Sequence, residues 1–335
     1  MTELQLARIA AVDKDSYRIL NDGRECLAEL EGKLRFAIRS ALDLPTVGDW
    51  VNVKYYNDGN LAIINNILPR RSLLKRKAAG KKIDYQLISA NIDIAFVIQS
   101  LDHNYNLRRL ERYLVAVNEG GISPVVLLSK ADLLSPGEIQ ERIAAIRELN
   151  KDLPVIVFSS QTGAGLDDIR ALITKDKTYC LIGSSGVGKT TLLNKLLGQD
   201  ILRTAEVRVK DSHGRHTTNR RQMIVLDCGG VIIDTPGMRE LGNIDIDAGL
   251  DATFGEIAGL SRNCRFKDCT HTNEPGCAIR AALEQGSLTG ERLKNYQKLQ
   301  KEAAFNEMSY ADKRKKDKSF GKMVKNTIKH HKKYQ

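Results

Sequence analysis

The sequence has no run of about 18 apolar residues, the length that a membrane-spanning helix needs. The stretch Met1–Arg8 lacks both a basic start and an apolar core, so it does not predict a signal peptide. Cysteine is scarce, with six residues in 335 and no regular framework, which argues against a disulfide scaffold. These absences exclude a membrane partner and predict a protein of the reducing cytoplasm.

Aromatic residues are also scarce, at 5% of the chain, and this limits what the N-terminal segment is expected to do. Residues 1–68 alternate in a way that predicts five short strands, which suit a small β-barrel of the OB-fold type. The usual platform for stacking bases is thin, because exposed aromatic candidates are limited to Tyr17, Tyr55 and Tyr56. An RNA-binding domain is the favoured interpretation, and a plain scaffold is the alternative. The strands are expected at Leu6–Val12, Glu25–Glu31, Leu34–Arg39, Trp50–Tyr56 and Leu61–Leu68.

Positive charge is concentrated in two blocks, within a net charge of +11. Between Tyr310 and Gln335, ten Lys and Arg residues stand against Asp312 and Asp317, a local charge of +8. Such blocks favour a polyanionic partner, for which RNA is the natural candidate, although a solvated tail and linker are the alternative. The second block contains no acid and carries Arg70, Arg71, Lys75, Arg76, Lys77, Lys81 and Lys82.

After this basic linker, near-continuous apolar runs alternate with helical patterns, as in a parallel sheet covered on both faces. Ser135-Pro136-Gly137-Glu138 has the form of a capping box, so it predicts a helix through about Leu149. The pattern predicts a doubly wound α/β domain over residues 69–242. Its strands are expected at Ile92–Ile98, Val125–Ser129, Val155–Phe158, Thr178–Gly183 and Gly230–Asp234.

A phosphate-binding motif opens the next predicted helix, which should run through Leu197. Gly183-Ser184-Ser185-Gly186-Val187-Gly188-Lys189-Thr190 fits the P-loop pattern, in which backbone N–H groups surround phosphate oxygens. Lys189 is expected to reach the terminal phosphates as a catalytic residue, Thr190 to ligate Mg²⁺, and Thr191 to add a nucleotide contact.

The other phosphate-side candidates lie downstream of the P-loop. Asp234-Thr235-Pro236-Gly237 follows an apolar strand, so Asp234 is expected on the Mg²⁺ side and the Gly237 N–H near the γ-phosphate. The polar loop between the two motifs, Gly214–Thr218, suits a switch that orders around Mg²⁺ and the γ-phosphate. Thr217 and Thr218 become candidates only through this position, since they otherwise look like ordinary loop residues.

The base-reading motif stands upstream of the P-loop, which reverses the usual order. In Ser129-Lys130-Ala131-Asp132 the carboxylate can accept hydrogen bonds from guanine N1–H and N2–H₂, a pair that adenine does not offer. Taken alone, this stretch is equally a helix-capping turn, but together with a P-loop it predicts a guanine reader. Ser159 and Ser160, in Ser159-Ser160-Gln161-Thr162-Gly163, are expected to back the purine.

A Cys/His cluster interrupts the polar, helical C-terminal part, residues 243–335. Cys264, Cys269, His271 and Cys277 have the spacing C-x₄-C-x-H-x₅-C, which predicts a closed, structural tetrahedral Zn²⁺ site. One zinc ion per chain is expected, since unrelated free thiols at this density are improbable.

With these motifs, the chain closely resembles the RsgA (YjeQ) family of circularly permuted GTPases that act in maturation of the small ribosomal subunit. The resemblance spans nearly the whole chain and includes Pro45–Val51, Gln86–Asp93, Arg108–Leu114, the nucleotide motifs in permuted order and the Cys/His cluster. It implies an OB domain, a GTPase domain and a zinc domain in a monomer, with GTP hydrolysis to GDP stimulated by the 30S subunit and binding to 16S rRNA.

The resemblance also assigns two residues and exposes two departures. Thr218 matches the family's switch threonine, and His216 matches a histidine proposed to help hydrolysis. Ser129 stands where Asn is common, and its shorter side chain is expected to weaken nucleotide binding. Met238 stands where many GTPases carry a water-orienting Gln. A nonhydrolytic RNA-binding switch is therefore the alternative function, and a P-loop kinase or ATPase is a more distant one.

Overall fold

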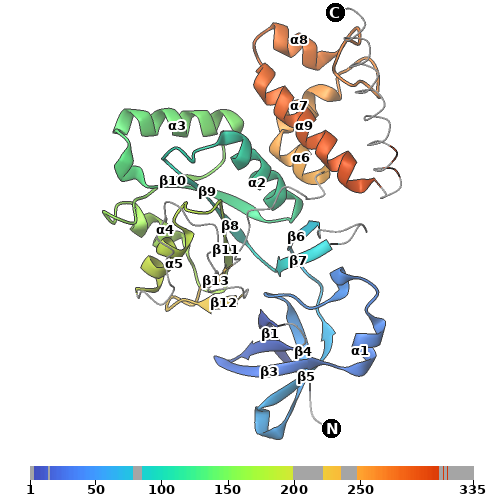
Figure 1. Cartoon of the computed structure of the whole chain (residues 1–335), viewed down its shortest axis with the longest axis vertical. Helices are drawn as coiled ribbons and strands as arrows, with labels where there is room; N and C mark the ends of the chain where they lie inside the picture. The colour runs from blue at the N-terminus through green and yellow to red at the C-terminus, as the bar shows by residue number, and fades with distance from the viewer. Residues whose placement is uncertain are drawn as a thin grey trace, which may run out of the picture.

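The computed structural model describes residues 4–13, 16–77, 85–198, 222–234 and 247–308, together with residues 312 and 315. Three parts follow one another along the long axis: a β-barrel, a central α/β layer and a group of helices (Figure 1). Within the described residues, the helices are all too short or too polar to cross a bilayer.

The N-terminal barrel has five strands that close in the order β1–β2–β3–β5–β4–β1, which confirms the predicted small OB-like barrel. Its core is fully buried and includes Ile9, Ile19, Val53 and Ile64. The strands are β1 (Gln5–Val12), β2 (Tyr17–Asn21), β3 (Arg24–Leu30), β4 (Trp50–Tyr56) and β5 (Leu61–Ile67).

The strand predicted at Leu34–Arg39 is wrong. That segment forms the short helix α1 (Gly32–Ala37), because β3 pairs directly with β5 and leaves no free edge for another strand. The fifth strand is instead β2, which pairs with β3 across the turn at Asp22-Gly23. Both glycine and aspartate there have a positive φ, as a tight hairpin turn requires.

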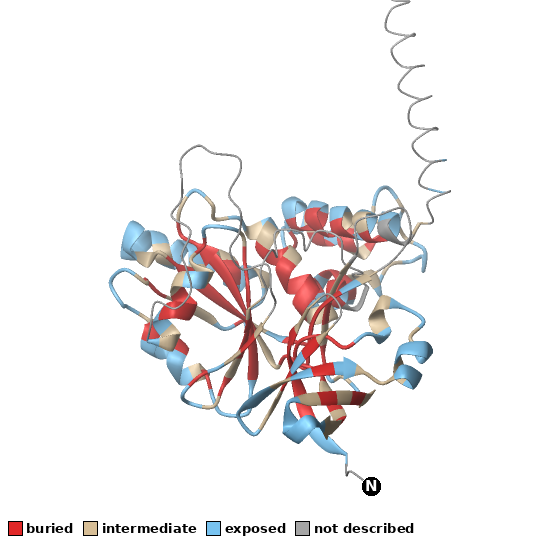
Figure 2. Cartoon of the chain, turned by 60° about the horizontal axis from the view of Figure 1, so that its bottom comes forward, coloured by how far each residue is buried: buried red, intermediate tan, exposed pale blue. Residues whose placement is uncertain are grey.

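The central sheet confirms the five predicted parallel strands and adds an unpredicted antiparallel one, β12 (Gln222–Val225). One buried apolar cluster fills each face, and Figure 2 shows the buried strands running between partly exposed helices. The capping box at Ser135 and Glu138 is present. The strands lie in the order β10 (Val155–Val157), β9 (Ser123–Ser129), β8 (Ile94–Ser100), β11 (Thr178–Ile182) and β13 (Val231–Asp234), and the helices are α2 (Leu107–Glu119), α3 (Pro136–Leu149), α4 (Leu166–Leu172) and α5 (Lys189–Leu197).

The barrel and the central sheet are hydrogen-bonded into one sheet. Barrel strand β1 pairs antiparallel with β12, with Ala11 opposite Gln222. The segment predicted as a basic linker contains an ordered hairpin, β6 (Leu73–Lys77) and β7 (Tyr85–Ala90), so that prediction is incomplete. In the described residues, the barrel is therefore linked to the central sheet by strand pairing, and strands β6 and β7 lie in the segment between them.

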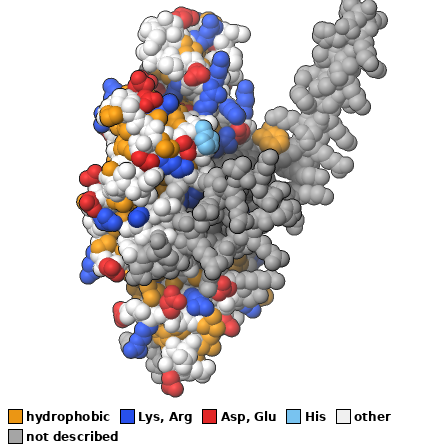
Figure 3. Space-filling model, turned by 60° about the vertical axis from the view of Figure 1, so that its left-hand side comes forward, with side chains coloured by type: hydrophobic (Ala, Val, Ile, Leu, Met, Phe, Trp, Pro, Cys, Tyr) orange, Lys and Arg blue, Asp and Glu red, His pale blue; other side chains and the backbone are white. Residues whose placement is uncertain are grey.

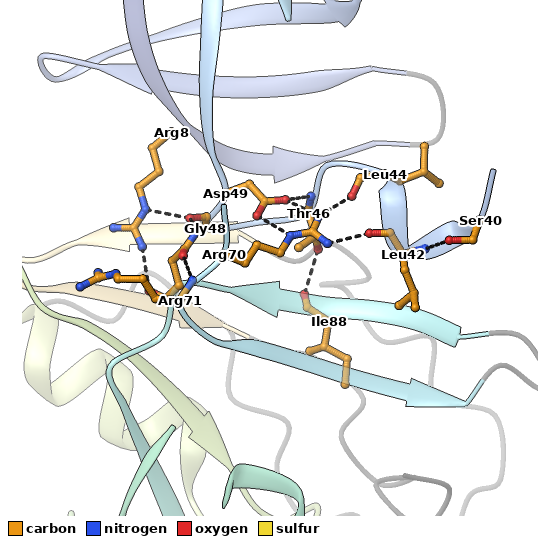
Figure 4. Close-up of polar contacts among 11 residues, drawn as sticks. Arg8, Ser40, Leu42, Leu44, Thr46, Gly48, Asp49, Arg70, Arg71 and Ile88 are labelled. Atoms are coloured by element: carbon orange, nitrogen blue, oxygen red, sulfur yellow. Dashed lines mark hydrogen bonds and ion pairs between the residues drawn. The ribbon is translucent and has the colours of Figure 1, made fainter. Parts of the chain in front are cut away.

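Side chains reinforce this junction (Figure 4). Asp49, which is fully buried, forms a 2.8 Å ion pair with Arg70, and Arg70 also donates to the carbonyl groups of Leu42 and Leu44. Arg8, on β1, donates to the Gly48 carbonyl and reaches across to the Thr178 hydroxyl at 2.7 Å. Arg70 thus has a structural partner, although the sequence placed it in a block expected to bind a polyanion.

The C-terminal helices pack against α2. Glu111 of α2 and Arg292 of α9 form an ion pair in which both side chains are buried. Asn295 donates to the other Glu111 oxygen, and Arg292 also bonds Glu256 at 2.7 Å and the Thr253 carbonyl at 2.9 Å. The helices are α6 (Asp247–Thr253), α7 (Gly255–Ser261), α8 (Ala278–Glu284) and α9 (Gly290–Glu307).

Candidate nucleotide site and metal centre

The sequence motifs converge at one edge of the central sheet. Strands β9, β10, β11 and β13 are parallel, so the residues that follow their carboxyl ends meet at the same edge. The base-reading loop follows β9, the P-loop follows β11, and Asp234 ends β13. Ligands in open α/β sheets bind at this edge, so its location alone marks it as the candidate site.

The P-loop geometry depends on two glycines. A Cβ on Gly183 would lie 2.7 Å from the Ile98 carbonyl oxygen, too close for any other residue. Gly188 has φ +95°, a left-handed conformation that glycine favours, and it is the N-cap of α5. The chain can therefore turn sharply from β11 into α5 and present N–H groups at a helix N-terminus, where anions bind.

Lys189 and Asp234 lie close enough to influence each other at this site. The Lys189 Nζ donates to the carbonyl oxygens of Gly183 and Ser184, each at 2.7 Å. Burial raises the pKa of Asp234, and the positive charge of Lys189 opposes that rise. The first helical residues, Thr190 and Thr191, follow at the start of α5. The structure therefore brings the predicted phosphate lysine and metal carboxylate together.

The base-reading loop is held by Ser159. Lys130 adopts a left-handed conformation with φ +60°, which turns the chain out of β9 into the short turn Ala131–Leu133. The Asp132 carboxylate accepts a hydrogen bond from the Ser159 hydroxyl, which also accepts from the N–H groups of Gln161 and Thr162 at 3.2 Å. Ser159 therefore orients the exposed side chain of Asp132, and it belongs to the loop that the sequence predicted to back a purine. Ser160, in the same loop, is half-buried.

Ser129 connects the base-reading loop to the P-loop. Its hydroxyl, in a residue that is 2% exposed, donates to the Val187 carbonyl at 2.7 Å. The sequence predicts that serine, which is shorter than the asparagine common in the family, weakens nucleotide binding. In this chain the serine itself reaches the P-loop backbone.

The loop between β8 and α2 contains site residues that the sequence analysis missed. Asn104 donates to the Ser184 hydroxyl at 3.1 Å and to the Ser185 carbonyl at 3.3 Å, and Arg109 bonds the Asn104 side chain at 2.9 Å. Asp102 forms a 2.8 Å ion pair with Lys130. Burial raises the pKa of Asp102, but bonds from Lys130, Ser100 and the Asn104 N–H outweigh it, giving a pKa of about 2.

One sequence signal could have found this loop. Asp102 and Asn104 directly follow a buried strand, β8, whose carboxyl end lies at the same edge as the P-loop. One short loop therefore contacts both the phosphate-binding and the base-reading segments. Of the other predicted residues, His216, Thr217, Thr218 and Gly237 lie outside the described part of the chain.

The four predicted zinc ligands gather in the C-terminal part. Their ligand atoms all lie within 4.8 Å of one another. The Cys264 Sγ is 4.0 Å from the Cys277 Sγ, and each of these sulfurs is 3.6 Å from the His271 Nδ1. Tetrahedral zinc with Zn–S bonds of about 2.3 Å separates neighbouring ligands by roughly 3.6–3.8 Å, so the donor set fits this metal.

Charges of both signs are spread over the described surface. In Figure 3 several basic side chains lie side by side in the upper part of the visible face, with acidic side chains close to them. Over the barrel below, acidic and basic side chains are interspersed. The β6–β7 hairpin adds Lys75, which lies over the Tyr85 ring at 4.8 Å, and Arg76, which bonds Gln86 at 2.9 Å.

Comparison with known proteins gives one family. A model of the RsgA GTPase family matches residues 67–244. The small ribosomal subunit biogenesis GTPase RsgA 2 of Lactiplantibacillus plantarum is 46% identical over 90% of this chain and 84% of its own. The small ribosomal subunit biogenesis GTPase RsgA of Methanosarcina acetivorans is 43% identical over 89% of this chain and 79% of its own.

Two solved structures share the fold. YjeQ from Thermotoga maritima has a TM-score of 0.67 and 24% identity, covering 90% of this chain and 99% of that one. YloQ, described as a circularly permuted GTPase, has a TM-score of 0.64 and 23% identity, covering 91% and 97%. The predicted architecture of barrel, permuted α/β domain and C-terminal helices with a zinc-type cluster is thereby confirmed.

Proposed function

The chain belongs to the RsgA GTPase family and is a GTP-hydrolysing enzyme, and from this premise we propose that it acts in late maturation of the 30S ribosomal subunit. It binds 16S rRNA in the cytoplasm, and docking on the subunit stimulates hydrolysis of GTP to GDP. The proposal rests on the names of relatives more than 40% identical to this chain. The basic block between Tyr310 and Gln335 suits a polyanionic partner.

The observation that carries the GTPase chemistry is the bond between the Ser129 hydroxyl and the Val187 carbonyl. It joins a base-reading loop to a P-loop that lies 58 residues later in the sequence. A guanine nucleotide spans both loops, so their relative position sets how well base and phosphates are bound together.

Each site residue has a role in this proposal. Lys130 and Asp132 read the guanine base, and Ser129, Ser159 and Ser160 support them. The P-loop backbone holds the phosphates, and Lys189 neutralises charge that develops on them. Thr190 and Asp234 hold Mg²⁺, which supplies charge neutralisation between the phosphates when bound. Thr218 orders around that metal, and His216 aids hydrolysis.

The second metal has a structural role. Cys264, Cys269, His271 and Cys277 supply four ligands, which fill a tetrahedral Zn²⁺ shell and leave no open position for catalysis. Zinc then orders the loop between α7 and α8, and with it the surface of the C-terminal helices.

The decisive experiment measures GTP turnover with and without purified 30S subunits at two salt concentrations. We expect strong stimulation that fades as salt rises, because docking is electrostatic. Subunit binding without faster turnover contradicts the proposed stimulation, and the lack of binding at either salt concentration contradicts the proposed partner.

The guanine reader is tested by Asp132→Asn. An amide no longer accepts both guanine hydrogen bonds, so we expect GTP affinity to fall and affinity for xanthosine triphosphate, which offers the complementary acceptor, to rise. Competition of the two nucleotides against a fluorescent GDP analogue measures this change. Unchanged selectivity for GTP refutes the assignment of Asp132 to the base.

A further inference from the structure

The short helix α1 carries an aromatic side chain that is almost entirely in water. Phe36 is 90% exposed, the highest value among the exposed large hydrophobic residues of the described chain, where Leu133 follows at 56%. None of the six residues of α1 is buried. A phenylalanine ring in water contributes nothing to the barrel core, so its exposure calls for another explanation.

Three basic residues lie within three positions of Phe36 in the sequence. Lys33 and Arg35 lie on the same helix and Arg39 follows it, and all three are exposed. No ion pair joins any of them to another residue in the described ranges. The acid that follows, Asp43, accepts hydrogen bonds from the backbone N–H groups of Arg39 and Ser40 at 3.0 and 2.9 Å, so it caps the backbone.

The outer surface of β2 and β3 has no such excess of positive charge. OB-folds commonly bind nucleic acid on this strand face. Here acidic residues outnumber basic ones among its exposed charges, and one pair, Arg18–Glu25, is already matched at 3.6 Å. A polyanion therefore gains more by approaching the α1 side of the barrel. The exposed charged residues of this surface are Arg18, Asp22, Arg24, Glu25 and Glu29.

The chain after α1 is fixed to the rest of the molecule. The 3-10 turn Ala41–Asp43 is capped by the Ser40 hydroxyl and packs against β7. Arg70 holds the same segment through the Leu42 and Leu44 carbonyl groups, each at 2.6 Å, while it pairs with Asp49 (Figure 4). In Figure 1 α1 stands at the right-hand side of the barrel, beside this junction. A ligand on α1 is thus held at a set position relative to the GTPase domain.

We propose that Lys33, Arg35, Phe36 and Arg39, the α1 patch, bind single-stranded RNA, with one unstacked base on the Phe36 ring and phosphates on the cations. The inference rests on the proposed function, which makes RNA the partner, and it identifies where on the barrel that partner binds. Single-stranded RNA fits because its bases have free faces to stack, whereas duplex RNA hides them. Stacking on one ring also requires no particular sequence.

The first test measures the affinity of the full-length protein for a fluorescein-labelled single-stranded RNA of about 12 nucleotides. We expect Phe36→Ala to weaken binding at least about fivefold, since one lost base–aromatic stack has this effect. Leu27→Ala, at a residue 43% exposed on β3 of the same barrel, is the matched control and should leave affinity unchanged. Phe36→Trp should retain affinity, and RNA should quench the emission of the introduced tryptophan.

The second test separates the ring from the charges through salt dependence. Each phosphate contact with single-stranded nucleic acid adds about 0.7 to the slope of log affinity against log salt. Replacing Lys33, Arg35 and Arg39 with alanine should therefore flatten the slope by about 2. Phe36→Ala should leave the slope unchanged, and Arg18→Ala with Arg24→Ala on the β2–β3 surface should leave both affinity and slope unchanged.

The outcomes distinguish this inference from the proposed function. If wild-type protein binds the RNA and responds to 30S subunits, but Phe36→Ala binds within twofold of wild type, the α1 patch is wrong and the proposed function stands. Equal losses in Phe36→Ala and Leu27→Ala also overturn the patch, because they indicate damage to the barrel. If wild-type protein binds neither the RNA nor 30S subunits, both proposals fail.

Discussion

The GTPase domain is joined to its two neighbours in different ways. The barrel is attached through backbone contacts, namely the β1–β12 pairing, the hydrogen bond from the Ala90 N–H to the Val47 carbonyl and the close approach of Gly48 to Ala90, which the Asp49–Arg70 pair and Arg8 reinforce. The C-terminal helices are attached mainly through side chains, above all the buried Glu111–Arg292 pair and its partner Asn295. Hydrogen bonds between backbone groups form with most side chains in place, so substitutions there are tolerated. A buried ion pair, in contrast, requires particular residues.

The difference matters for stability. Removing one partner of a buried ion pair leaves an uncompensated charge, which costs far more than losing an exposed pair. Backbone pairing is sensitive to substitution only where two backbone segments lie so close together that a side chain does not fit between them. We therefore expect single substitutions to release the C-terminal helices more readily than the barrel.

The largest effect is expected at the metal centre of the C-terminal side. Cys277→Ser removes one of the four ligands, so the zinc content should fall from about one ion per chain to near zero, and the helices α7–α9 should become sensitive to protease. Atomic absorption and limited proteolysis measure the two effects. Cys228→Ser, at an exposed thiol outside the cluster, is the control. Retained zinc in Cys277→Ser refutes the ligand assignment.

Arg292→Ala should have the next largest effect. It leaves Glu111 buried without its counter-ion, which should cost about 3–5 kcal/mol in chemical denaturation. Arg280→Ala, whose partner Glu284 lies 3.9 Å away at the surface, should cost less than about 1 kcal/mol.

The pH dependence sharpens this prediction. Burial raises the pKa of Glu111, and Arg292 opposes the rise. Without Arg292 the folded state binds the Glu111 proton more tightly than the unfolded state, so stability falls as pH rises. The deficit of Arg292→Ala should therefore shrink at mildly acidic pH. A deficit that does not change with pH argues against an uncompensated Glu111 charge.

On the barrel side, one weak point is Gly48. Its φ is +92°, and a Cβ there would lie 2.1 Å from the Ala90 carbonyl oxygen. Gly48→Ala should lower the free energy of unfolding by more than the roughly 1–3 kcal/mol of backbone strain alone. Gly23→Ala has a similar φ of +79° and open space around it, so it measures the strain without the clash. Equal losses in the two variants contradict a tight junction.

The smallest effect is expected from a substitution at the nucleotide site that leaves both junctions intact. Asn104→Ala removes two hydrogen bonds to the P-loop, and if GDP binding loses the equivalent of one such bond, about 0.5–1.5 kcal/mol, GDP should dissociate roughly 2–10 times faster. Stopped-flow release of a fluorescent GDP analogue measures the rate. His103→Ala, in the same loop but exposed, should release GDP at the wild-type rate. An unchanged melting temperature in both variants shows that the effect is local.

The sequence predicts the nucleotide edge well and the junctions poorly, for a physical reason. Apolar runs and the glycine spacing around Lys189 are local signals, so they identify the strands and the P-loop directly. The structural role of Arg70 depends on Asp49, 21 residues earlier, and a run of positive charge gives no sign of that partner. Asn104 was missed because its contacts with Ser184 form only after two strands pair.

The error at α1 has the same origin. Residues 34–39 fail to form a strand because β5, a distant segment, already occupies the edge of β3. Local pattern does not reveal such competition for an edge. As a result, Phe36, the most exposed aromatic ring of the described chain, was not among the stacking candidates predicted from the sequence.

The permuted order of the motifs also has a consequence for synthesis. Base-reading residues leave the ribosome before the P-loop, so the central strand β11 pairs with β8 after β8 and β9 have already been made, and β13 pairs with β11 later still. The described part of the nucleotide edge ends at Asp234, whereas Arg292 follows about 60 residues later, or roughly 3–12 s at usual rates of translation. During that interval Glu111 has no counter-ion, and the growing chain carries a finished sheet edge before it can dock its C-terminal helices.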